Sequence, residues 1–185
     1  TATTAIPALG TPPVSVSVSA SPAPRTVAWT ANDFLTAIWI AGVSLIVLRA
    51  VLAATFVRRL GRRARLLRDG PIVERLDRIR LSLRVRRPIR ILVSPRQWMP
   101  VTWGLFRPAI LLPSSVVSWS LESSERLDAV LAHEAAHIAR WDALAQFISR
   151  MGVAMFWFNP LMWIAARRAR LEREQACDDA VVALG

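Results

Sequence analysis

Two histidines and a glutamate lie in the short segment His133-Glu134-Ala135-Ala136-His137, and the chain has no other histidine. On a helix, residues four apart share a face, so the imidazoles of His133 and His137 can bind one zinc ion. Glu134 lies about 100° around the helix axis, where its carboxylate can reach a water on the metal without being a ligand. The segment therefore predicts a hydrolytic zinc (Zn2+) site with Glu134 as general base.

A catalytic zinc site needs a third protein ligand and one open position. The single cysteine, Cys177, excludes an internal disulfide and a zinc cage built from cysteines. The best candidate is Glu174, in the acidic segment 172–179. Asp178 follows four residues later, so one carboxylate can bind the metal while the other accepts the ring N–H of a ligand histidine. Alone, such a cluster is usually a solvated helix face; beside this histidine pair we expect it to serve the metal.

The composition does not fit an ordinary soluble domain. The 185 residues are 54% hydrophobic and include eight tryptophans, and the net charge of +11 comes entirely from arginine. A strongly basic chain binds either nucleic acid or an anionic membrane surface. The position of the arginines decides between these, and it favours the membrane.

The N-terminal part of the chain divides into three segments. Residues 1–28 are rich in Thr, Ala, Pro, Ser and Val, and we expect a disordered extracytoplasmic linker. Residues 29–57 are nearly all apolar, and residues 34–57 can cross a bilayer as one helix. Residues 58–70 form a basic juxtamembrane segment, which the positive-inside rule places in the cytoplasm against anionic lipids. Its arginines are Arg58, Arg59, Arg62, Arg63, Arg65 and Arg68.

Residues 71–185 are then predicted to form the zinc domain. The spacing of apolar residues predicts a helix over 71–83, a strand over 90–94, a loop from 98, a second strand ending at 113 and a zinc helix from Ser120 to about Asp142. Prolines at both ends of the second strand favour an edge strand. A peptide substrate is expected to lie along this exposed edge and to be held extended over the metal. The strand residues concerned are Ala109, Ile110, Leu111 and Leu112.

Residues 143–166 pose a topological problem, because they are apolar over nearly the length of a membrane span. A span here would place Glu174 across the bilayer from the two histidines, and one zinc ion could not bind all three. Asn159-Pro160 resolves the conflict, since Asn is a good N-cap and Pro a good first helical residue. We therefore expect a membrane-associated helical hairpin over residues 143–173 that returns the chain to the same side. We also expect the chain to be a fragment of a longer protein, truncated at both ends.

With these residues in hand, the chain resembles the BlaR/MecR-type antirepressor peptidases, which are membrane-bound transducers that sense beta-lactams. The resemblance covers the chain from about residue 29 onward, and CaaX-type and stress-type membrane peptidases fit less well. It rests on residues 104–113 (GLFRPAILLP), on 133–137 (HEAAH) followed by Arg140 and Asp142, on 157–161 (WFNPL) and on 174–178 (EQACD).

The resemblance implies an α+β, mainly helical gluzincin (zincin-like) domain with a small edge-exposed sheet and a preceding transmembrane helix. It implies His133, His137 and Glu174 as metal ligands, Glu134 as the catalytic glutamate and Asp178 as the supporting aspartate. It also implies a site on the cytoplasmic face of the cell membrane and a transcriptional repressor as the protein finally removed. Beta-lactam sensing is not implied, because this sequence contains no sensor domain.

Three functions are compatible with these observations. The first is a membrane-bound zinc endopeptidase that cleaves a cytoplasmic regulatory protein or itself. The second is a non-catalytic membrane transducer that uses the same fold to bind a partner, and an intact Glu134 disfavours it. The third is a DNA-binding protein that uses the arginines of residues 58–68. Their position beside a membrane span favours contact with lipids and no direct contact with nucleic acid.

Overall fold

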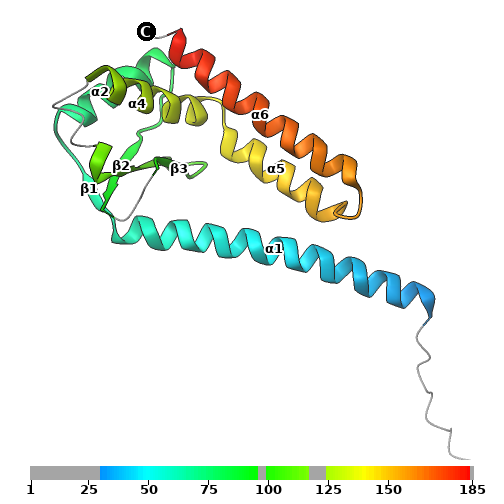
Figure 1. Cartoon of the computed structure of the whole chain (residues 1–185). Coiled ribbons are helices and arrows are strands. Elements are labelled where there is room, and N and C mark those ends of the chain that lie inside the picture. Colours follow the sequence, from blue (N-terminus) through cyan, green and yellow to red (C-terminus); the bar gives the residue numbers. More distant parts are fainter. Residues whose placement is uncertain (1–29, 96–98, 117–123, 184–185) are drawn as a thin grey trace, which may run out of the picture.

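The computed structural model describes residues 30–95, 99–116 and 124–183, so the predicted linker (1–28) and Ser120 lie outside the described residues. The chain is mainly helical with one small sheet, which confirms the predicted α+β, mainly helical class (Figure 1). Its elements are α1 (Ala31–Arg63), β1 (Arg65–Leu67), α2 (Pro71–Ser82), β2 (Arg90–Ser94), β3 (Val101–Trp103), β4 (Ala109–Pro113), α4 (Ser124–Ala139), α5 (Asp142–Met155) and α6 (Pro160–Val182).

The four strands form a mixed sheet in the order β1-β2-β4-β3. β2 and β4 are parallel, while β1 and β3 add antiparallel on either side. The strands predicted at residues 90–94 and 109–113 are both confirmed. β1 and β3 were not predicted, because three-residue strands beside arginines, glycine and proline carry too few positions to show an alternating pattern.

The prediction that Ala109, Ile110, Leu111 and Leu112 form an exposed edge is wrong. β4 lies between β2 and β3, and all four residues are fully buried. An uninterrupted apolar run is typical of a strand covered on both faces, and this feature outweighs the flanking prolines. The edge strand that contacts α4 is β3.

Both faces of the sheet are covered, and the register decides which residue faces which helix. Ile110 and Leu112 belong to the main core with α2 and α4, whereas Ala109 and Leu111 form a second cluster with the end of α1. Side chains alternate along a strand, so β4 packs against α4 on one face and α1 on the other. The sheet thus lies between α4 and the C-terminal end of α1 (Figure 1).

The predicted helix over residues 34–57 forms the greater part of α1. It begins in a capping box between Thr30 and Asp33 and continues past Val57 to Arg63. The basic segment 58–70 is therefore the last part of α1, followed by β1. None of the residues in α1 is buried. Among the described residues, α1 is the one helix whose length and apolar composition suffice to cross a membrane.

In the region of the predicted membrane-associated hairpin, residues 143–173, the structure has two helices, α5 and α6, joined by a turn at residues 156–159. The Asn159 side chain accepts a hydrogen bond from the Leu161 N–H at 2.9 Å, and Pro160 follows as the first helical residue. The hairpin lies along α1, where Trp39 Nε1 donates to the Met155 carbonyl at 3.0 Å. A Cβ on Gly42 would come within 2.2 Å of the Trp157 ring, so glycine is needed for this close approach.

Candidate metal centre

α4 carries both histidines on one face, as the spacing predicted. Their Nε2 atoms are 3.2 Å apart, and the two rings meet edge to face at 84°. Both residues are partly exposed, although the helix around them is anchored by buried Leu127 and Leu131. Packing on one side of α4 therefore leaves the imidazoles directed at a common point that solvent can reach.

α6 brings Glu174 to the same point from the other side. Its Oε2 lies 3.8 Å from Nε2 of His133 and 3.7 Å from Nε2 of His137. Donors about 2.1 Å from a zinc ion at tetrahedral angles are roughly 3.4 Å apart, so the three separations suit such an ion. The three residues predicted as metal ligands are thus brought together in a group that could hold a metal ion.

Each ligand histidine has a carboxylate on its other ring nitrogen. Nδ1 of His133 is 3.0 Å from Oδ1 of Asp178, as expected for a supporting aspartate. Nδ1 of His137 is 2.7 Å from Oδ2 of Asp142, a residue to which the sequence analysis gave no role. Carboxylates in these positions fix the tautomer that leaves Nε2 free to bind a metal.

A break in the helix explains how Asp142 reaches His137. The zinc helix was expected to run to about Asp142, but it ends at Ala139, and Trp141 adopts a left-handed conformation (φ 59°). α5 then starts at Asp142, whose side chain turns back toward α4. Since a left-handed residue lies outside any helical pattern, the spacing of five residues from His137 gave no signal for this contact.

Arg87 stabilises the break. Its guanidinium donates to the Ile138 carbonyl at 3.0 Å and also to the Leu105 carbonyl, and it stacks 3.7 Å above the Trp141 ring. One side chain therefore connects the end of α4 to the turn between β3 and β4. These contacts fix the position of α4 relative to the turn that follows the edge strand β3.

Cys177 lies buried behind His137. Its sulfur is 3.2 Å from Nδ1 of His137 and 3.6 Å from Oδ2 of Asp142, and these three residues form a second group of potential ligands. Burial, followed by the Asp142 carboxylate, raises the pKa of the thiol to about 12, so the thiol is protonated at neutral pH. Because Nδ1 of His137 already faces Asp142, we interpret this group as support for His137.

Glu134, the residue after His133 on α4, turns toward the edge strand of the sheet. It is buried, and its Oε2 accepts a hydrogen bond from the hydroxyl of Thr102 on β3. The sequence analysis missed Thr102, because it treated residues 98–108 as a loop. The structure instead places the edge strand β3 beside the predicted general base.

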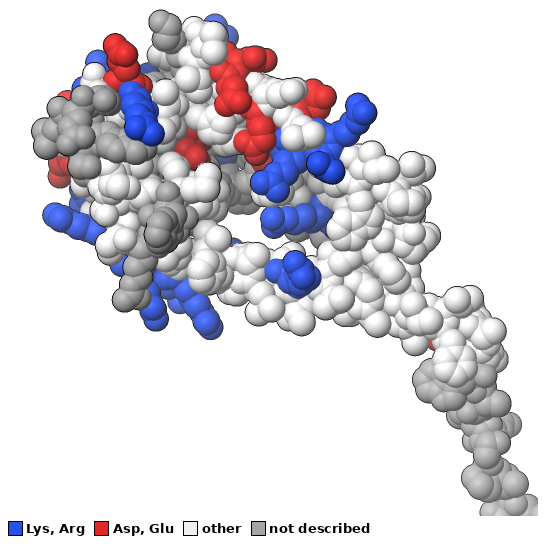
Figure 2. Space-filling view, viewed as in Figure 1, with Lys and Arg blue, Asp and Glu red and all other residues white. Residues whose placement is uncertain are grey.

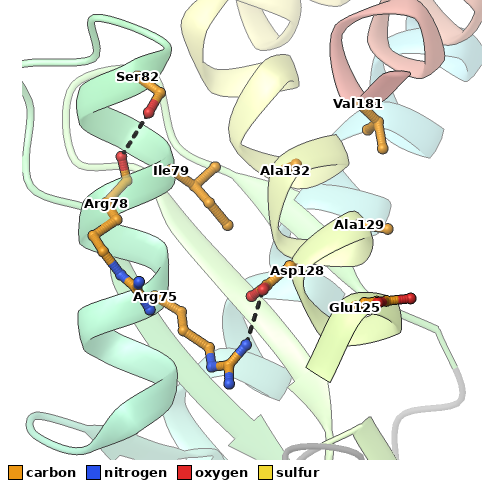
Figure 3. A pocket seen from close by; sticks show the side chains of 9 residues that line it. All are labelled: Arg75, Arg78, Ile79, Ser82, Glu125, Asp128, Ala129, Ala132 and Val181. Carbon is orange, nitrogen blue, oxygen red and sulfur yellow. Dashed lines mark hydrogen bonds and ion pairs between the residues drawn. The ribbon is translucent and has the colours of Figure 1, made fainter. Parts of the chain in front are cut away.

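A cavity of about 360 Å³ lies away from this site, between α2, α4 and the last turn of α6 (Figure 3). Arg75 on one wall pairs with Asp128 on the other at 2.8 Å. None of the predicted ligands lines it. The candidate metal centre is therefore the open, partly exposed surface around the histidines and does not include this cavity.

Two histidines on one helix, a carboxylate from a second helix and a buried glutamate beside them form the kind of site that metallopeptidases use. The family model described as BlaR1 peptidase M56 matches residues 3–184. The chain therefore belongs to this metallopeptidase family, which confirms the resemblance deduced from its motifs.

Named relatives agree with this assignment. The regulatory protein BlaR1 of Bacillus licheniformis is 27% identical over 146 residues, which are 79% of this chain and 24% of that protein. The methicillin resistance mecR1 proteins of Staphylococcus aureus and Staphylococcus epidermidis are 27% identical over 79 residues, which are 43% of this chain and 13% of each of those proteins. The chain thus spans about a quarter, or less, of the length of these relatives.

Proposed function

We propose that the chain is a membrane-bound, zinc-dependent endopeptidase with a gluzincin fold. The observation that carries this proposal is the convergence of two Nε2 atoms and one carboxylate oxygen within 4.8 Å of one another. The two His–Asp contacts support it, because they orient both rings for metal binding. When bound, zinc would act as a Lewis acid, polarising the scissile carbonyl and lowering the pKa of water.

The remaining steps belong to side chains of the protein. Glu134 would take the proton of the attacking water and pass it to the leaving amine, as a general base and then a general acid. Because Glu134 is buried, few water molecules can reach its carboxylate. The Thr102 hydroxyl donates a hydrogen bond to one of its two oxygens. Asp142 and Asp178 would hold His137 and His133 in place while charge develops at the site.

The substrate is proposed to bind along β3 rather than along β4. β3 (Val101–Trp103) has one neighbouring strand among the described residues, so its outer edge can pair with an extended peptide. Thr102 lies in the middle of this strand and contacts Glu134. A peptide paired with β3 would therefore run past the catalytic carboxylate.

The surface supports a membrane setting. In Figure 2 the charged side chains gather at the end that carries the sheet, while the outer part of α1 and the hairpin turn are almost uncharged. Large apolar side chains such as Phe147, Phe158 and Trp163 are exposed there. We infer that α1 crosses the cell membrane and that the hairpin enters one leaflet. The arginines of residues 58–68 would meet anionic lipid headgroups on the cytoplasmic side.

The substrate class follows from the family and this location. A site at the cytoplasmic surface can cleave a cytoplasmic regulatory protein, of the repressor type, or the chain itself. The printed names of the relatives, a regulatory protein and methicillin resistance proteins, support a role in signal transduction. Cleavage of such a protein would convert an event at the membrane into a change of gene expression.

Metal analysis of the purified chain in lipid nanodiscs tests the proposed site. We expect about one zinc ion per chain, and its loss in His137→Ala and Glu174→Ala. Glu172→Ala is the matched control, because this exposed glutamate lies on the same helix but belongs to neither ligand group. Unchanged zinc content in Glu174→Ala would contradict the proposed ligand set.

A further inference from the structure

β3 makes a different contact on each of its two faces. Toward α4, the Thr102 hydroxyl donates to Oε2 of Glu134. On the opposite face, the ring of Trp103 packs against Gly61 near the end of α1. Because neighbouring residues of a strand point to opposite faces, this short strand connects α1 with the predicted general base.

The register of the sheet requires this arrangement. Thr102 pairs with Ile110, which faces α2 and α4, and Trp103 pairs with Ala109, which faces α1. Directly opposite residues in an antiparallel pair point to the same face. A shift of one residue would turn Thr102 toward α1 and remove its contact with Glu134.

The contact between α1 and β3 has no spare room. A Cβ on Gly61 would lie 2.7 Å from Cζ2 of Trp103 and 3.7 Å from a methyl carbon of Leu92. Movement of this end of α1 toward the sheet must therefore displace the Trp103 ring. Since Trp103 and Thr102 share one peptide bond, such a displacement reaches the residue that holds Glu134.

We propose that Thr102 is the positioning residue for Glu134, and that α1 acts on the site through Trp103 on the same strand. The inference rests on the proposed function and adds to it a route by which a membrane helix regulates cleavage. Thr102 restricts Glu134 to one orientation, so the free carboxylate oxygen is presented to the reacting water. A change in the position of α1 alters that orientation while the metal ligands on α4 and α6 stay in place.

The test uses the zinc-loaded full chain in lipid nanodiscs and acetohydroxamate as the probe. A hydroxamate binds a catalytic zinc ion and gives its proton to the neighbouring carboxylate, so its affinity reports on Glu134 without any substrate. Thr102→Val removes the hydroxyl at nearly constant volume, and we expect about tenfold weaker hydroxamate binding with zinc affinity unchanged. Thr102→Ser should keep the affinity within about twofold, because it retains the donor. In a Glu134→Gln background, Thr102→Val should cause no further loss.

Two matched substitutions in α1 test the connection to the membrane helix. Gly61→Ala and Gly42→Ala each add one methyl group against a tryptophan ring, on β3 and on the hairpin turn respectively. We expect Gly61→Ala to weaken hydroxamate binding roughly three- to tenfold and Gly42→Ala to leave it unchanged. Combining Gly61→Ala with Trp103→Phe, which makes room for the methyl group, should recover most of the loss.

The outcomes separate the two proposals. If the zinc-loaded wild-type chain does not bind the hydroxamate, the proposed function is wrong and this inference falls with it. If the wild type binds but Thr102→Val binds equally well, or loses zinc as well, Thr102 does not position Glu134. Equal losses in Gly61→Ala and Gly42→Ala would overturn the connection through β3.

Discussion

The two halves of the molecule differ in what they bury. The head, which consists of the sheet with α2 and α4, encloses fully buried side chains such as Leu127, Leu131 and Ile110. The arm, which consists of α1 and the α5–α6 hairpin, leaves large apolar side chains exposed and has no buried residue in α1. The head thus has a closed apolar core, whereas the arm leaves apolar surface uncovered, as the proposed membrane setting requires. The proposed metal centre lies where the two halves meet, because α4 belongs to the head and Glu174 lies on a helix of the arm.

The largest expected effect tests whether peptide cleavage depends on Glu134, which lies in the head. Glu134→Gln should lower peptide cleavage by about 10²- to 10⁴-fold, because the general base is lost, while zinc content and folding are unchanged. Cleavage of a casein substrate or of the chain itself, measured beside zinc content, checks this. Glu125→Gln, an exposed position on the same helix, should cleave normally. Full signalling by Glu134→Gln in cells would favour the non-catalytic transducer.

The second prediction tests the contrast in burial directly. Leu127→Ala should lower the free energy of unfolding of the head by about 2–5 kcal/mol, because it leaves a cavity in a closed core. Leu161→Ala, at a hairpin residue that is 67% exposed, should cost less than about 0.5 kcal/mol in detergent. Denaturant titrations of the two variants measure the difference. Similar losses in both would show that the arm is packed as tightly as the head.

The third prediction concerns the boundary between the halves. Asp142 is buried and 2.7 Å from His137, whereas Asp178 is exposed and 3.0 Å from His133. Asp142→Asn should weaken zinc binding about 10- to 100-fold, and Asp178→Asn should weaken it less, since water can replace an exposed partner. Competition with a zinc chelator gives both affinities. A greater loss for Asp178→Asn would reverse the ranking.

The smallest effect is expected within the arm. Asn159→Ala removes the cap of α6 and should destabilise the hairpin by about 1 kcal/mol, while Asn159→Ser should restore most of this. Protease sensitivity at the hairpin turn in nanodiscs measures the change. Zinc affinity should stay within about twofold, because Glu174, the one proposed ligand on α6, lies in the half of the helix away from Asn159. A large loss of zinc would show that the turn and the metal centre are not independent.

Much of the site could be predicted because it depends on short-range spacing. His133 and His137 share a helical face by geometry alone, and Asn159-Pro160 marks a helix start in any context. The hairpin followed from one further condition, namely that Glu174 must return to the histidines. By contrast, Asp142 reaches His137 only through the left-handed Trp141, and a conformation of this kind depends on contacts such as the Arg87 stack.

The order of strands could not be predicted for a similar reason. Residues 109–112 are apolar at every position, which is compatible with an edge or with a covered centre until the partners are known. The partners are β2, β3 and the end of α1. β2 could be predicted as a strand but not as a neighbour of β4, β3 is too short to predict, and the end of α1 is distant in the chain. The assignment of the substrate edge to β4 failed at this step.

The sequence by itself determined the side chains proposed as metal ligands, the long apolar helix and the turn of the hairpin. These are properties of neighbouring residues, and local geometry and hydrophobicity control them. Only the tertiary structure decided that Asp142 and Thr102 support His137 and Glu134, and that β3 is the edge beside the site. Those contacts join residues whose approach depends on how the sheet and helices pack, and no local pattern encodes that packing.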